Sequence, residues 1–115
     1  MADLTLQNLA DKLPAGSLTE TADDVTISLK AVTGEAAVQL ADEMVAEPLS
    51  KIMSAAAEAE DDYNTANPST QINSYPNPTF GAPVADGNGG FVASRNHTLS
   101  VRAPLNLDEI TAVSV

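Results

Sequence analysis

The feature that most limits how this chain can fold is a long stretch, residues 64–90, without any regular apolar pattern. The stretch holds four of the seven prolines and four of the six glycines, and Asp86 is its only charged residue. Proline is excluded from helix interiors and central strands, and glycine weakens both. Residues 64–90 therefore separate the patterns on either side, as an extended arm or a long loop.

All four aromatic residues lie in this stretch or next to it: Tyr63, Tyr75, Phe80 and Phe91. The composition is typical of disorder, yet a loop of this length is uncommon in a compact domain. Ordering it costs about 1–2 kcal/mol of backbone entropy per residue, so contacts must offset that cost. The predicted interface anchors of the arm are Ile72, Tyr75, Phe80, Val84 and Phe91. The arm either lies across a neighbouring subunit or folds back over its own sheet.

The chain, with 115 residues, is long enough for one small domain, residues 1–115. Aromatic residues make up 3% and tryptophan is absent, so the core must use small side chains. Burying alanine gains much less than the roughly 1.5–3 kcal/mol of a Leu, Ile or Phe side chain. Such a monomer is expected to be marginally stable, and association with copies of itself or with other structural proteins would supply the missing burial.

Five basic residues stand against sixteen acidic ones, and the net charge is -11. This charge repels phosphate backbones and anionic membranes, which argues against nucleic acid and membrane as partners. No window of about 18 apolar residues is present to span a bilayer. The acidic surface either keeps the chain soluble or matches a basic partner or divalent cations.

The chain has no cysteine, which excludes disulfides, thiolate zinc ligation and cysteine catalysis. Its N-terminal residues lack a basic region followed by an apolar run, so no signal peptide is expected. The expectation is synthesis in the cytoplasm, with a virion as the destination if the chain is a phage structural protein.

Residues 3–13 are predicted to form a helix capped by Asp3, with one apolar face. That face consists of Leu6, Leu9, Ala10 and Leu13. A helix this short must dock on something to persist. Residues 14–24 are polar and are predicted to be a connecting turn.

Residues 25–32 alternate between apolar and polar side chains and are predicted to be a strand that breaks at Thr33 and Gly34. Residues 35–63 follow a helical spacing with Thr33 as cap. Pro48 is predicted to kink this helix or split it in two. Its acidic end, residues 58–62, has the unfavourable sign for the helix dipole and would fray unless a partner or cation compensates.

The C-terminal part alternates again and predicts two strands. Apolar positions of the first are Leu99, Val101, Ala103, Leu105 and Leu107, and Pro104 suits an edge strand. The second runs from Thr111 to Val115, and Thr111, Val113 and Val115 are expected to add onto a neighbour's sheet. The predicted fold class is α+β: a small antiparallel sheet packed on one long, Pro48-kinked helix, with a long extended arm rich in Pro, Gly and Asn.

Motifs for chemistry are weak. His97 is the only histidine, and no nucleophile motif accompanies it, so a structural role is favoured over a catalytic one. "DGNGG" at 86–90 fits a hairpin turn better than a calcium loop, because ligand position twelve is His97. The acidic run 58–62 is either a solvated helix end or a weak cation site. No catalytic residue, metal site or cofactor is predicted.

These features favour a non-enzymatic structural subunit of a homopolymeric or multi-protein assembly. A virion part, such as a phage capsid decoration, neck or tail protein, or a related tube or injection particle, is the specific hypothesis. The alternative is a soluble acidic adaptor domain that binds a basic protein.

Overall fold

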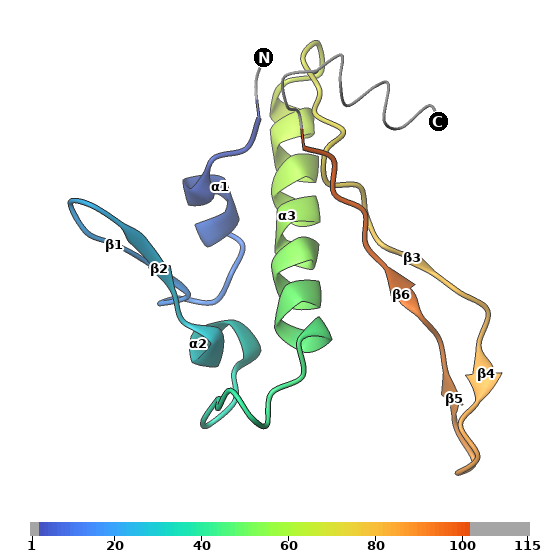
Figure 1. The fold of residues 1–115 in the computed structure, drawn as a ribbon. Coiled ribbons are helices and arrows are strands. Elements are labelled where there is room, and N and C mark those ends of the chain that lie inside the picture. The colour runs from blue at the N-terminus through green and yellow to red at the C-terminus, as the bar shows by residue number, and fades with distance from the viewer. Residues whose placement is uncertain (1–2, 102–115) are drawn as a thin grey trace, which may run out of the picture.

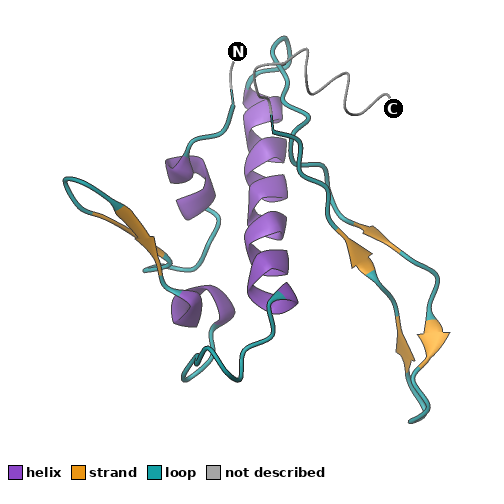
Figure 2. Cartoon of the chain, in the orientation of Figure 1, coloured by secondary structure: helices purple, strands orange, loops and turns teal. Residues whose placement is uncertain are grey.

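The longest element of the fold is α3 (Ala46–Ala66), which runs through the middle of the molecule (Figure 1). The computed structural model describes residues 3–101. The other elements are α1 (Leu6–Ala10), β1 (Leu18–Glu20), β2 (Val25–Ile27), α2 (Leu29–Thr33), β3 (Thr79–Phe80), β4 (Val84–Ala85), β5 (Phe91–Val92) and β6 (Arg95–Asn96). One long helix packed with small antiparallel sheets confirms the α+β class (Figure 2).

The long helix begins eleven residues later than its apolar spacing predicts, since residues 35–45 are not helical. Pro48 lies in the first turn of α3, where a missing N–H leaves no hydrogen bond unmade. Pro48 therefore stands at the start of the helix and not at a kink within it. Thr33 does not cap this helix, whose N-cap position is Val45, without a side-chain hydrogen bond.

The first helix is shorter than the predicted residues 3–13. Thr5 caps α1 in place of Asp3, through a capping box in which the Thr5 side chain accepts from the backbone N–H of Asn8 and the Asn8 side chain accepts from the Thr5 N–H. The helix packs against α3, as its length requires. Leu13 is buried, whereas Leu6 is exposed.

Residues 14–33 differ from the sequence prediction in two ways. β1 lies in the predicted turn and pairs with β2, antiparallel, with Leu18 opposite Ile27. The predicted strand 25–32 ends at Ile27, because the Ser28 side chain accepts a hydrogen bond from the Ala31 N–H and starts α2. Gly34, at φ 75°, ends α2 in the left-handed conformation that suits glycine.

The core is thin and is made mostly of small side chains. Leu13, Val32 and Ala55 form its centre, with Leu9, Leu18 and Ile52 packed against it. Further along α3, the buried apolar residues are Ala56, Ala57 and Ala59. Of the large apolar side chains in residues 3–101, Leu13, Val32 and Ile72 are buried, whereas thirteen are exposed. Few of the large apolar side chains in residues 3–101 are therefore fully buried within one chain.

The second half of the chain leaves α3 and returns as an antiparallel hairpin, residues 79–96 (Figure 1). In place of one sheet on the helix, the described residues form three separate two-stranded sheets: β1–β2, β3–β6 and β4–β5. The radius of gyration is 17.7 Å, against about 13 Å for a compact domain of this length. The predicted final strand, with Thr111, Val113 and Val115, lies outside the described residues, as do Ala103, Leu105 and Leu107.

Candidate interaction site

The stretch 64–90 divides into two parts with different surroundings. Residues 67–77, which we call the docked loop, lie along the C-terminal half of α3. Residues 79–96 form the hairpin, which points away from the helix (Figure 1). The predicted arm anchors fall on both parts, so each part is described in turn.

The docked loop is held by one asparagine side chain, which pairs with the backbone of a loop residue through two hydrogen bonds. The Asn64 side chain donates to the Ile72 carbonyl at 2.9 Å and accepts from the Ile72 N–H at 2.7 Å. The Ile72 side chain is 5% exposed. Ile72 thus anchors the loop through a buried side chain and through backbone groups that pair with Asn64 of α3.

Tyr75 ties the end of the docked loop to two other elements. Its backbone N–H donates to Oε1 of Glu60, which is buried in α3, at 2.9 Å. Its hydroxyl donates to Oδ1 of Asp3 at 3.0 Å. Partial burial, and then the hydrogen bond to Asp3, raise the pKa of Tyr75. Tyr75 therefore contacts its own chain and lies half-buried there.

The hairpin, in contrast, exposes its large side chains. Phe80 is 63% exposed, Val84 58% and Phe91 75%. Val84 pairs with Val92 and Ala85 with Phe91. Because paired residues share a face and successive residues alternate, one face carries two valines and the other carries Ala85 and Phe91. Both faces of the ribbon are apolar at β4–β5, whereas β3–β6 pairs Thr79 with Asn96 and Phe80 with Arg95. An isolated two-stranded ribbon is marginal in water.

The tip of the hairpin is a tight turn around one carboxylate, as the glycine-rich motif predicts. Asp86 Oδ1 accepts from the N–H groups of Asn88 at 2.7 Å and Gly90 at 3.1 Å. These two hydrogen bonds hold the pKa of Asp86 below its ordinary value. Gly87 and Gly89 have φ of 84° and 87°, which only glycine adopts readily.

The root of the hairpin contacts α3 through a polar cluster that the sequence did not indicate. Ser50 Oγ lies 2.9 Å from His97 Nε2, and Arg95 Nη1 donates to the same oxygen at 3.5 Å. The Arg95 guanidinium also lies over the Phe80 ring, 5.4 Å from its centre. Spacing along the chain could not have linked Ser50 to His97, which are 47 positions apart.

A serine hydrogen-bonded to a histidine could also act as a catalytic nucleophile with its general base. Catalysis would need a third group that orients the imidazole and donors for an oxyanion. Within the described part of the chain, the hydrogen bond to Ser50 is the one that the His97 ring makes. The arrangement fits a structural link between hairpin and helix.

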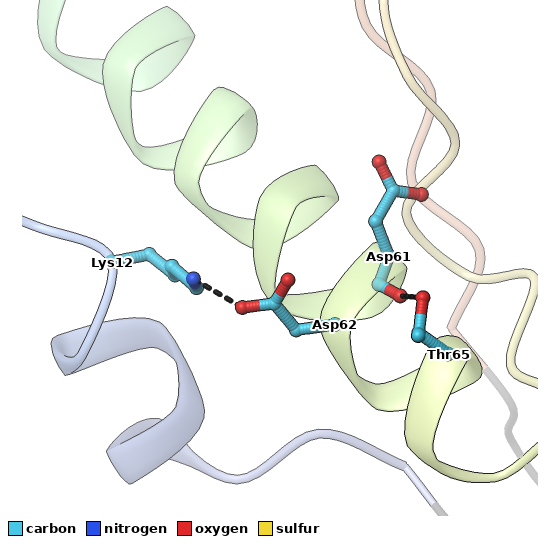
Figure 3. A network of polar contacts seen from close by, with 4 residues as sticks. All are labelled: Lys12, Asp61, Asp62 and Thr65. Atoms are coloured by element: carbon cyan, nitrogen blue, oxygen red, sulfur yellow. Dashed lines mark hydrogen bonds and ion pairs between the residues drawn. The ribbon is translucent and has the colours of Figure 1, made fainter.

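The acidic run at the end of α3 is partly neutralised by the chain itself. Lys12 forms an ion pair with Asp62, whereas the side chain of the adjacent Asp61 points in a different direction (Figure 3). The Thr65 hydroxyl donates to the Asp61 carbonyl at 2.8 Å. The hydrogen bond with Asp62, reinforced by its charge, raises the pKa of Lys12. In residues 3–101, no three His, Asp or Glu side chains converge into a metal-binding group.

A second apolar surface lies where the sequence predicted helix. Residues 36–45, α2 and the first turns of α3 enclose a groove of about 710 Å³, which we call the apolar groove. Its apolar walls include Leu29, Leu40, Met44, Val45, Leu49 and Ile52. Leu40, Met44, Val45 and Leu49 are exposed. The helical spacing predicted for residues 35–63 included Met44, Val45 and Leu49, although Met44 and Val45 precede the helix.

Within residues 3–101, no helix combines the length and apolar character needed to cross a membrane. No protein-family model, curated protein or solved structure matches the chain. The function must therefore be inferred from its own surfaces.

Proposed function

We propose that this protein is a non-enzymatic structural subunit that assembles with copies of itself or with other structural proteins through its hairpin. The observation that carries the proposal is the apolar character of both faces of a ribbon that projects from the fold. Phe80 and Phe91, two of the four aromatic residues, lie on this ribbon and are largely exposed.

The energetics support the same proposal. A small core of Leu13, Val32 and Ala55 holds α1, α2 and α3 together, while thirteen large apolar side chains of residues 3–101 are exposed. Exposed apolar patches of this kind mark protein contacts. Aromatic side chains are also enriched among the residues that dominate binding energy.

The assembly that we propose is a virion part, such as a phage capsid decoration, neck or tail protein, or a related tube or injection particle. A subunit with a net charge of -11 would stay soluble until it is incorporated into such a particle. The terminal strand proposed to add to a neighbour, with Thr111, Val113 and Val115, would be a second contact of this kind.

The test is the molar mass in solution, measured by light scattering on a sizing column across a range of protein concentrations. The wild-type chain should form higher oligomers as concentration rises. The double variant Phe80→Ala, Phe91→Ala should weaken association by about 30-fold or more, since each removed aromatic is a candidate hot spot. Leu6→Ala, which removes an exposed side chain from α1, is the matched control and should associate normally.

A compact monomer at every concentration would contradict self-assembly. Binding of such a monomer to a basic protein, lost at high salt, would favour the alternative role as an acidic adaptor, whose supporting observation is the net charge of -11. Unchanged association of the double variant would show that the hairpin is not the contact.

A further inference from the structure

Two apolar surfaces that are exposed among residues 3–101 differ in shape in a way that makes them complementary. The hairpin is a thin ribbon with apolar side chains on both faces. A flat partner surface would cover one face and leave the other in water, whereas a groove encloses both. The apolar groove offers two such walls, one from residues 36–45 and one from α2 and α3.

Charge is also matched between the two surfaces. The hairpin has two charged residues, Asp86 at its tip and Arg95 at its root. The groove carries Lys30 and Glu43 among its lining residues, and Glu35 and Glu47 lie next to Glu43. Each charge on the ribbon thus has an opposite charge available at the groove, and the uncharged part of the ribbon meets apolar walls.

Among residues 3–101, Glu35, Glu43 and Glu47 form no ion pair. A hydrogen bond with Glu35, followed by burial and the negative charges of Glu35 and Glu47, raises the pKa of Glu43. A guanidinium brought in by another molecule would relieve this repulsion.

The geometry points to a head-to-tail contact: the hairpin of one copy inserts into the apolar groove of a second copy. This inference rests on the proposed function and specifies its partner as the same chain. In Figure 1 the hairpin and the elements that form the groove, α2 and the start of α3, lie on different sides of the molecule. A copy whose groove is filled therefore still presents its hairpin. Such a heterologous contact repeats, and it closes into a ring or extends into a filament.

The test uses two variants that each lose one surface. The hairpin variant is Phe80→Ala, Phe91→Ala. The groove variant is Leu40→Asp, Met44→Asp, which places charges on two exposed positions outside the helices. Circular dichroism should show the wild-type helix content for both. Each variant alone should remain monomeric at concentrations where the wild-type chain associates. Their mixture should form a one-to-one dimer that grows no further, because one intact hairpin meets one intact groove.

The outcomes separate the two proposals. A wild-type chain that is monomeric at every concentration removes self-assembly and this inference together, and leaves assembly with another structural protein as the form of the proposed function. If the wild-type chain associates and the groove variant does so equally well, the hairpin binds elsewhere, and this inference fails while the proposed function stands. The same holds if both variants are monomeric and their mixture stays monomeric.

Disulfide trapping gives a second readout, since the chain has no cysteine of its own. Ala85→Cys in one copy and Met44→Cys in another should form a mixed disulfide under mild oxidation. Ala85→Cys with Leu6→Cys is the control pair and should form far less. Equal yields from the two pairs, or Met44→Cys linking preferentially to itself, would overturn the head-to-tail contact.

Discussion

The docked loop and the hairpin are adjacent and share a composition rich in proline, asparagine and glycine, yet their surroundings differ sharply. In the docked loop Ile72 is buried, and the side chains of Asn64 and Glu60 from α3 bind the loop backbone. The hairpin is bonded mainly to itself, and Phe80 and Phe91 face solvent. The comparison teaches that one polar stretch contains both a segment completed by its own fold and a segment that needs a partner.

The largest expected effect is the difference in stability loss when an apolar side chain is truncated in the docked loop and in the hairpin. Ile72→Ala should lower the free energy of unfolding by about 2–4 kcal/mol, because it removes a buried side chain. Phe91→Ala should change the stability of the monomer by less than about 0.5 kcal/mol, since the ring is exposed. Urea unfolding at low protein concentration measures both. A large loss for Phe91→Ala would show that the hairpin is already packed in the free chain.

The next effect isolates the polar anchor of the docked loop. Asn64→Ala should cost about 2 kcal/mol, because it leaves the N–H and carbonyl of buried Ile72 without partners. Asn77→Ala is the control: its side chain donates to Asp61 at 3.2 Å on the exposed surface, and its loss should cost less than about 0.5 kcal/mol. Equal costs would mean that Asn64 does not hold the loop.

Hydrogen exchange sharpens the comparison without mutation. In the dilute monomer, the Tyr75 amide, bonded to Glu60, should exchange at least about tenfold more slowly than the Gly81 amide, bonded to Ser94 across the hairpin. Raising the concentration should slow exchange at Gly81 and leave Tyr75 unchanged. Protection of Gly81 that is already high in the monomer, and independent of concentration, would contradict a hairpin completed by a partner.

The smallest effect is a pH dependence confined to the hairpin tip. The pKa of Asp86 lies below its ordinary value of 3.8, so its contribution to the turn is fully present above that value. The contribution is lost as pH falls through the lower pKa of the folded chain. Amide chemical shifts of Asn88 and Gly90 should therefore move together in acid, and in Asp86→Asn they should not titrate. Shifts that move at the ordinary value would show that the turn is open.

The sequence predicted features that depend on composition and on local chemistry. The α+β class, the main part of the long helix and the glycine-rich turn at 86–90 are all confirmed. The prediction failed where two patterns overlap: Leu29 continues the alternation of Val25 and Ile27, and it is also part of α2, which the Ser28 cap starts. At residues 35–45 the apolar spacing suggested a helix. These residues are not helical, and their apolar side chains line a groove instead of a core.

The candidate site was predicted in part. The stretch and its apolar side chains were identified, but the sequence could not divide them into Ile72, which is buried, and Phe80, Val84 and Phe91, which are exposed. That division depends on Asn64 and Glu60, two α3 residues whose partners lie eight and fifteen positions away. The Ser50–His97 link has a longer separation still and leaves no local signal.

The shortness of the paired strands in the hairpin limits how the ribbon can associate with the wrong partner. β3–β6 and β4–β5 are each two residues long, and Pro83, which has no N–H to donate, stands between Phe80 and Val84. Long unbroken strand edges are templates for amyloid-like stacking, and prolines and short strands block that route. The ribbon can therefore expose apolar side chains without presenting a long backbone edge for pairing with other strands. Its partners are then selected by the fit of side chains.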